Sequence, residues 1–138
     1  MLFIPIKSKY KKQHKGKSFN RVNSNINFFS LNFGSVGLKV VSPGRLNSTE
    51  LKTLKQTLNK TLKRRACIRM NVFPQTPITK KPLEIRMGKG KGNVNSWVFK
   101  AKPGVVLVEI QTKFILSAVK ALKLAKIRIS LNTVIIYR

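Results

Sequence analysis

FGSVGLKVVSPGRLNSTELKTLKQTLNKTL, residues 33–62, is the stretch of sequence that decides the fold. Its first part, Phe33 to Leu46, indicates a strand that ends at the turn signal Ser42-Pro43-Gly44. A helix is predicted directly afterwards, with Asn47 as the N-cap and Glu50 completing a capping box. Leucines recur at spacings of three and four and form one apolar stripe, at Leu51, Leu54, Leu58 and Leu62. The stretch therefore predicts a strand followed by a helix that packs on a sheet.

Further strands are predicted downstream of this helix. One should run from Cys67 to Phe73 and be closed by Pro74 and Pro77, with Cys67 as a small buried hydrophobe. Two more, Trp97 to Lys100 and Val105 to Ile110, are expected to pair with each other around the turn at Pro103-Gly104.

The C-terminal third predicts a second helix and a last strand. The helix should cover roughly Lys113 to Lys126, and its predicted inward residues are Phe114, Ala118, Ala121, Leu122 and Ala125. Ile127, Ile129 and Leu131 then alternate with polar residues, as in a half-buried strand. The expected fold class is α+β, with two helices packed on a mixed or antiparallel sheet. We expect a basic N-terminal arm and Asn-rich linker at residues 1–32 and a single domain at residues 33–138.

Charge is the property that limits function most. Twenty-nine Lys and Arg face only three acidic residues, so the formal net charge is +26. These charges form about 325 like-charged pairs, and after screening by physiological salt their repulsion amounts to roughly 5 kcal/mol. A repulsion of that size rivals the whole stability of a small domain, about 5–15 kcal/mol. A polyanion removes it, so nucleic acid is the expected partner.

Enzymatic chemistry finds little support. The acids Glu50, Glu84 and Glu109 are scattered, and His14 lies in a basic segment without an orienting acid. A single cysteine and a single histidine cannot build a four-ligand zinc site, and no apolar run reaches the 18 residues of a membrane span. We therefore expect no enzyme activity, no cofactor, no metal and no membrane insertion.

Two basic segments are the candidate sites. KSKYKKQHKGK, residues 7–17, lacks apolar periodicity and indicates an extended arm, in which Tyr10 is the better candidate for stacking on a base. Residues 86–92, RMGKGKG, do not satisfy a nucleotide-binding pattern, but a backbone without Cβ atoms can approach a phosphate ridge closely. A solvated hairpin tip and an RNA contact both remain open for this loop. For Trp97, stacking on RNA and packing in the core also remain open.

The sequence ITKKPLEIRMGKGKGNVNSWV, residues 78–98, closely resembles the signature of the bacterial-type large-subunit ribosomal protein L-sixteen family. Other segments agree in order and spacing: KYKKQHKGK, FGSVGLK, GRL before the first helix, VFP and KPGVVLVEI. The chain departs from the family where Arg69 and Asn71 stand in place of the usual Trp and Arg. The Asn-rich stretch before Phe33 does not match either.

The resemblance implies an α/β-hammerhead-like fold in the large ribosomal subunit, with large-subunit rRNA, A-site tRNA and neighbouring ribosomal proteins as partners and no homo-oligomer. Charge alone leaves open an alternative to this structural role, a sequence-independent nucleic-acid-coating protein. Candidate rRNA-binding residues are Lys9, Tyr10, Lys11, Lys12, His14, Lys15, Lys17, Lys39, Arg45, Lys63 and Arg64. The loop expected near tRNA contains Lys80, Lys81, Arg86, Met87, Gly88, Lys89, Gly90, Lys91 and Gly92.

Composition predicts the compartment. Lys, Asn, Ile and Phe make up 52 of the 138 residues, a bias expected of an AT-rich genome. The resemblance begins almost at Met1, which leaves no space for a cleaved presequence. Lys89, where plastid relatives commonly carry serine, favours mitochondria. We expect a protein of the mitochondrial ribosome, with the cytoplasm of an AT-rich bacterium as the alternative.

Overall fold

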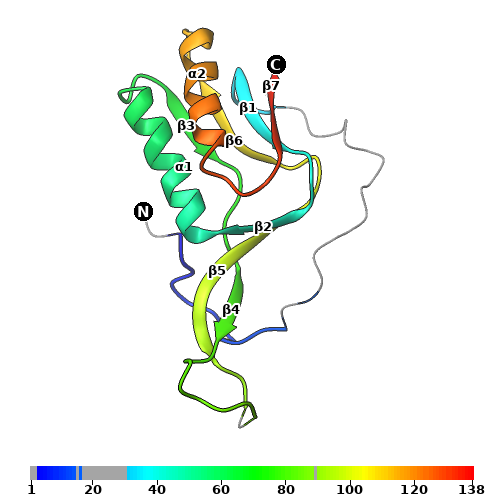
Figure 1. Cartoon of the computed structure of the whole chain (residues 1–138). Coiled ribbons are helices and arrows are strands. Elements are labelled where there is room, and N and C mark those ends of the chain that lie inside the picture. The colour runs from blue at the N-terminus through cyan, green and yellow to red at the C-terminus, as the bar shows by residue number, and fades with distance from the viewer. Residues whose placement is uncertain (1–2, 15, 17–30, 89) are drawn as a thin grey trace.

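The computed structural model describes residues 3–14, 16, 31–88 and 90–138. Seven strands and two helices lie within these described ranges (Figure 1). In chain order they are β1 (Val36–Val40), β2 (Gly44–Asn47), α1 (Ser48–Thr61), β3 (Cys67–Met70), β4 (Thr76–Lys80), β5 (Asn93–Ala101), β6 (Val106–Gln111), α2 (Ile115–Lys126) and β7 (Thr133–Tyr137).

The strands form two sheets rather than the one that was expected. The first sheet has the order β3-β6-β1-β7 and the second the order β2-β5-β4. Every described pairing is antiparallel, which settles the choice between a mixed and an antiparallel sheet. Both helices cover one side of the first sheet, and the β4–β5 hairpin extends away from it (Figure 1). The predicted α+β class with two helices is confirmed.

Helix α1 forms as the sequence predicts. The backbone N–H of Asn47 donates to Glu50 Oε2 at 2.9 Å, and the capping box is present. This bond satisfies a donor that the first turn leaves without a helical partner. The leucine stripe lies in the hydrophobic core, where α1 contacts α2 and the strands β2, β3 and β5; its members Leu51, Leu54 and Leu58 are completely buried, and Leu62 is nearly so. Burial of each leucine contributes roughly 1.5–3 kcal/mol, so this stripe fixes α1 on the sheet.

Strand pairing departs from the expectation in two places. Gly44–Asn47 is a strand, β2, and not simply a turn that enters the helix. The turn at Pro103-Gly104 exists, with Gly104 at φ +91°, but the strands on either side do not pair with each other. Instead β5 pairs with β2 and β4, and β6 pairs with β1 and β3. The prediction of a β5–β6 hairpin was wrong because the chain passes from one sheet to the other at this turn.

The last strand lies further along the chain than predicted. Ile127, Ile129 and Leu131 lie in the connection between α2 and β7, and Ile127 is exposed. Strand β7 covers Thr133–Tyr137 and pairs with β1. Ile129 and Leu131 still pack against the core, which accounts for their alternation. Of these two adjacent apolar segments, only Thr133–Tyr137 pairs with β1, and it therefore forms the strand.

Three side chains also lie elsewhere than predicted. Cys67 is exposed because β3 is an edge strand on which Ile68 and Met70 face inward. Pro77 does not close a strand but lies within β4, where an edge position tolerates a residue without an N–H group. Phe114 precedes α2 as its N-cap and is 68% exposed, so its predicted place in the core is wrong. The other four predicted inward residues of this helix are fully buried.

Glu109 is a carboxylate buried in the middle of the first sheet. It is 2% exposed and accepts hydrogen bonds from the backbone N–H groups of Phe33 at 2.7 Å and Gly34 at 2.9 Å. The side-chain amide of Asn71 donates to it at 2.7 Å. Burial acts to raise the pKa of Glu109, but these hydrogen bonds outweigh burial and hold the pKa below its ordinary value. The Arg69 guanidinium lies 3.6 Å from the centre of the Phe33 ring. Both departures from the family pattern, at positions 69 and 71, therefore make internal contacts.

Candidate nucleic-acid interface

The β4–β5 hairpin carries the glycine-lysine loop. Pairing of Thr79 with Val94 and of Lys80 with Asn93 closes the base of the hairpin. Gly92 lies so close to β4 that a Cβ atom at this position would meet the carbonyl oxygen of Lys80 at 2.7 Å. This glycine is therefore required for the two chains to approach each other. The hairpin places the loop at the end of the molecule furthest from the helices (Figure 1).

At its tip the loop is open to solvent. Arg86 is exposed and Met87 is fully exposed. Gly88 and Gly90 have φ values of +95° and +88°, and a Cβ atom on either would meet nothing within 4 Å. Their conformation and not a lack of space therefore explains the glycines. The Lys81 ammonium donates a hydrogen bond to the Gly88 carbonyl and so ties the loop back to its base.

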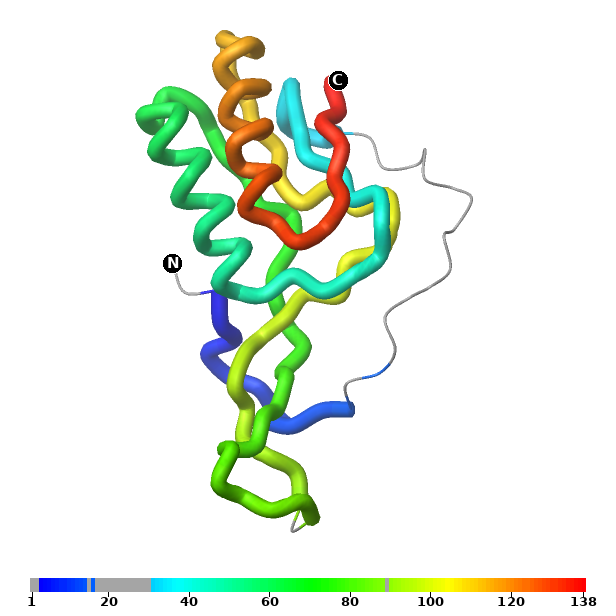
Figure 2. Tube along the Cα trace, viewed as in Figure 1, coloured from blue at the N-terminus to red at the C-terminus, as the bar shows by residue number. Residues whose placement is uncertain are grey.

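The N-terminal segment runs alongside this hairpin (Figure 2). Lys12 Nζ donates to the Lys91 carbonyl at 2.8 Å, and Lys91 Nζ donates to the Gln13 carbonyl at 2.7 Å. We call these two bonds the arm–loop clamp. Phe3, which is 6% exposed, anchors the start of the segment in the core, with its ring centre 6.4 Å from that of Phe73. Two basic segments 79 residues apart are thereby joined into one surface.

Contacts at the end of the segment involve Arg45 on β2. Its Nη2 donates to the Gly16 carbonyl at 2.8 Å, whereas its Nε is buried without a hydrogen-bond partner among the described residues. Arg45 is half-buried, so it contributes to the surface mainly by holding the arm. Trp97 of β5 is also half-buried and lines a groove of about 660 Å³ together with arm residues Pro5 to Lys9.

The acceptors of three lysine side chains determine the electrostatics of this surface. Lys12, Lys81 and Lys91 all donate to backbone carbonyls, which carry no formal charge. These bonds therefore orient the positive charges but do not neutralise them. A phosphate group can supply the missing negative charge while the lysines keep their remaining donors.

Most predicted site residues of the arm and loop come together on this surface. Those in the described residues are Lys9, Tyr10, Lys11, Lys12, His14, Lys80, Lys81, Arg86, Met87, Gly88, Gly90, Lys91 and Gly92. Tyr10 is 64% exposed, and Lys9 Nζ lies 5.5 Å from the centre of its ring. Lys15, Lys17 and Lys89 lie outside the described residues.

The remaining predicted residues lie elsewhere. Lys39 is half-buried within β1. Lys63 and Arg64 follow the end of α1, far from the loop, and both adopt left-handed backbone conformations with φ values of +46° and +60°. The structure thus separates the predicted rRNA-binding set into an arm–loop surface and a second basic region.

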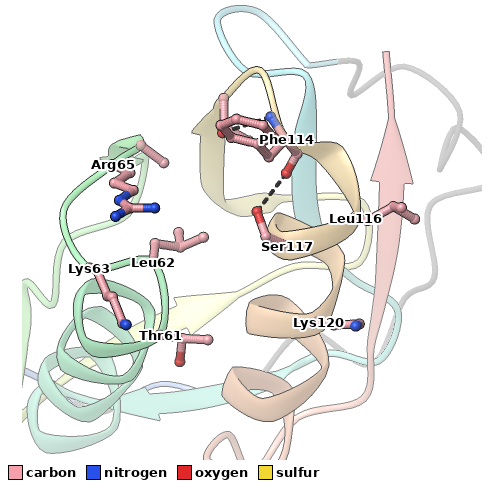
Figure 3. A pocket seen from close by; sticks show the side chains of 10 residues that line it. Thr61, Leu62, Lys63, Arg65, Phe114, Leu116, Ser117 and Lys120 are labelled. Carbon is pink, nitrogen blue, oxygen red and sulfur yellow. Dashed lines mark hydrogen bonds between the residues drawn. The ribbon is translucent and has the colours of Figure 1, made fainter.

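This second region contains a cleft that the sequence did not predict. A hollow of about 490 Å³ lies between the end of α1 and the start of α2 (Figure 3). Its lining includes Arg65, Phe114, Ser117 and Lys120. The run Lys63-Arg64-Arg65 was the sequence signal for a basic site here, but placing Phe114 in the core concealed the aromatic part.

Among the described residues, no group of three or more His, Cys, Asp or Glu could hold a metal ion. The described helices also include none that is long and apolar enough to cross a membrane.

A basic arm fixed to a glycine-lysine loop, on an α+β fold with a net charge of +26, defines a protein of the polyanion-binding class. Comparison with known proteins identifies the family. Residues 5–136 match the family model described as Ribosomal protein L16p/L10e, so the chain belongs to this family. It is accordingly a structural component of the ribosome and not an enzyme.

Three bacterial relatives, each described as large ribosomal subunit protein uL16, are 42% identical to the chain. The protein of Blochmanniella pennsylvanica (strain BPEN) aligns over 139 residues, which cover 100% of both chains. That of Wigglesworthia glossinidia brevipalpis aligns over 130 residues, 94% of this chain and 92% of its own. That of Buchnera aphidicola subsp. Cinara cedri (strain Cc) aligns over 132 residues, 96% and 94% respectively. The predicted family resemblance is confirmed.

Proposed function

We propose that the chain acts in the large ribosomal subunit, where it binds large-subunit rRNA, contacts neighbouring ribosomal proteins and helps to position A-site tRNA. Its relatives are large-subunit proteins, which supports the first part of this proposal. The observation that carries the second part is the arm–loop clamp, because it presents two basic segments as one oriented surface at the end of a hairpin.

Division of labour follows from how far the arm and the loop project at this end of the molecule. The arm residues Lys9, Lys11 and Lys12 lie beside the hairpin and are suited to contact the phosphates of rRNA. The loop projects beyond them, with the cation of Arg86 and the open backbone of Gly88 and Gly90. A projecting tip of this kind can reach an RNA that arrives after the subunit is assembled, as a tRNA does.

Replacement of both Lys89 and Lys91 by Ala tests the role of the loop. We expect the variant to enter large subunits with near-normal yield but to slow A-site tRNA accommodation, because Lys91 is exposed outside the core and Lys89 is its neighbour in the loop sequence. Lys52 and Lys60 are exposed on α1, so their replacement by Ala removes the same charge elsewhere and serves as the matched control. If the loop variant fails in subunit assembly while accommodation is normal in the subunits that form, the loop is a folding anchor and the proposed positioning role is wrong.

A second experiment tests specificity. The proposal requires that large-subunit rRNA compete for the chain better than bulk DNA at equal phosphate concentration, at about 0.15 M salt. Equal competition by the two polymers would instead support a sequence-independent coating protein.

For the compartment, we propose the mitochondrial ribosome. The AT-rich composition and Lys89 support it, whereas the bacterial origin of the relatives is equally consistent with a bacterial cytoplasm. We expect an antibody against the chain to detect it in gradient-purified mitochondrial large subunits. Its absence there would reject this location.

A further inference from the structure

Phe114 is an aromatic side chain that the fold leaves open. Its ring is 68% exposed, although the preceding strand β6 and the following helix α2 both supply core residues. It borders two hollows, one of about 490 Å³ and one of about 420 Å³. Arg65 and Thr112 also line both hollows. The ring therefore stands between two spaces, each within the range of volumes typical of small-ligand sites.

Local hydrogen bonds hold the backbone of Phe114 in place. Its N–H donates to Thr112 Oγ1 at 3.1 Å, and its carbonyl accepts from Ser117 Oγ at 2.7 Å (Figure 3). Ala118 N–H donates to the same carbonyl at 3.3 Å. Because both backbone polar groups are engaged, the ring is presented at a defined position and not on a free loop.

Cations line the two hollows beside this ring. Lys63 and Arg65 extend from the end of α1 on the opposite side of the cleft (Figure 3), Lys120 lines the first hollow and Lys113 lines the second. None of the three acids of the chain lines either hollow. Lys63 adopts a left-handed backbone conformation beside the cleft, which costs a side-chain-bearing residue about 1–2 kcal/mol. These surroundings suit a ligand that carries an anionic group beside a flat, apolar group.

We infer that this cleft binds an unpaired nucleotide of RNA, whose base stacks on Phe114 while Lys63, Arg65 and Lys120 contact its flanking phosphates. The inference rests on the proposed rRNA binding but adds a second site, at the opposite end of the fold from the arm–loop surface. Stacking of a base on an aromatic side chain contributes about 1–3 kcal/mol and needs no particular base. A base-paired nucleotide is already stacked and does not offer its face, so the site discriminates single strands from duplexes.

The first test compares the full chain with its Phe114→Ala variant. The probes are a ten-nucleotide single-stranded RNA that contains 2-aminopurine and an RNA duplex of equal charge. We expect the variant to bind the single strand about 5- to 150-fold more weakly and the duplex within twofold of the parent chain. Quenching of 2-aminopurine fluorescence should also be lost. Phe114→Tyr should retain both properties. Tyr137→Ala, which removes another exposed aromatic, should change neither.

Failure of this inference differs from failure of the proposed function. If the parent chain does not prefer large-subunit rRNA at all, the proposed function fails. If it does, but Phe114→Ala binds both probes like the parent chain, or loses both equally, only the stacking site is overturned. In assembled large subunits, a photoreactive phenylalanine analogue at position 114 should form its cross-link with rRNA. A cross-link to another protein would identify a peptide as the occupant and overturn the inference.

Discussion

The arm–loop clamp is the feature whose removal tests the proposed surface most directly. Replacing Lys12 or Lys91 by Met keeps the length of the side chain but removes the ammonium donor. Lys12→Met abolishes the 2.8 Å bond to the Lys91 carbonyl, and Lys91→Met abolishes the 2.7 Å bond to the Gln13 carbonyl. The double variant loses both bonds while every backbone acceptor remains.

The expected effect follows from the exposure of these bonds. A hydrogen bond contributes about 0.5–1.5 kcal/mol net, and an exposed one lies at the lower end of that range. Each single variant should therefore lower the ratio of docked to undocked arm about twofold, and the double variant about fivefold. Phe3 remains buried in the core, so global stability should change little.

Hydrogen exchange of residues 7–14, followed by mass spectrometry, measures the docking directly. Exchange in this segment should accelerate by the same factors, whereas exchange in α1 should not change. The double variant Lys52→Met and Lys60→Met removes two exposed charges from α1 and leaves the clamp intact, so it controls for the loss of charge. Arm exchange in the clamp double variant that equals that of this control would refute the argument that the clamp joins the arm to the loop.

Three further predictions concern single residues. Burial acts to raise the pKa of Glu109, but hydrogen bonds hold it below 4.5, so its contribution to stability should be complete above about pH 4.5 and be lost as the pH falls through the folded-state pKa. Glu109→Gln should lower stability at neutral pH by about 1–3 kcal/mol and remove this acid dependence. The control Glu84→Gln should do neither. Gly92→Ala should accelerate amide exchange at the base of the β4–β5 hairpin, whereas Gly88→Ala, which meets open space, should not. Lys63→Gly should be about 1 kcal/mol more stable than Lys63→Ala in thermal unfolding, because glycine adopts positive φ freely, while both variants bind rRNA equally weakly.

Each of these has an outcome that contradicts it. Equal acid dependence of urea unfolding in the two glutamine variants would show that Glu109 does not titrate differently on folding. Equal hairpin exchange in the two alanine variants would remove the steric role of Gly92. Identical melting temperatures for the Gly and Ala variants at position 63 would mean that the left-handed conformation carries no strain.

Local signals in the sequence were sufficient where neighbours along the chain decide the structure. Helix α1 was predicted with its cap and its buried face, because the Asn47–Glu50 pair and the leucine stripe act within a few turns. The glycine-lysine loop was found by its composition and by the family resemblance. The arm and the loop were both predicted as RNA-binding sites, but nothing in the sequence indicated the contact between Lys12 and Lys91.

Long-range pairing accounts for what was missed. Whether β5 pairs with β6 or with β2 depends on segments about 50 residues apart, and the turn between β5 and β6 looks the same in either case. Exposure of Phe114 likewise depends on where α2 starts relative to β6, which shifts one aromatic residue from the core to the cleft. The cleft itself exists only because the end of α1 lies beside the start of α2, a contact made by tertiary packing.

Anchoring of Phe3 and Lys12 also has a consequence for biosynthesis. The groups that receive them, around Phe73 and Lys91, lie 70 and 79 residues further along the chain. During translation the basic segment thus leaves the ribosome well before the residues that it contacts have been synthesised. Until then its lysines are free to capture nascent or partly folded RNA. Closure of the chain onto the hairpin would afterwards convert this early encounter into a contact of fixed geometry.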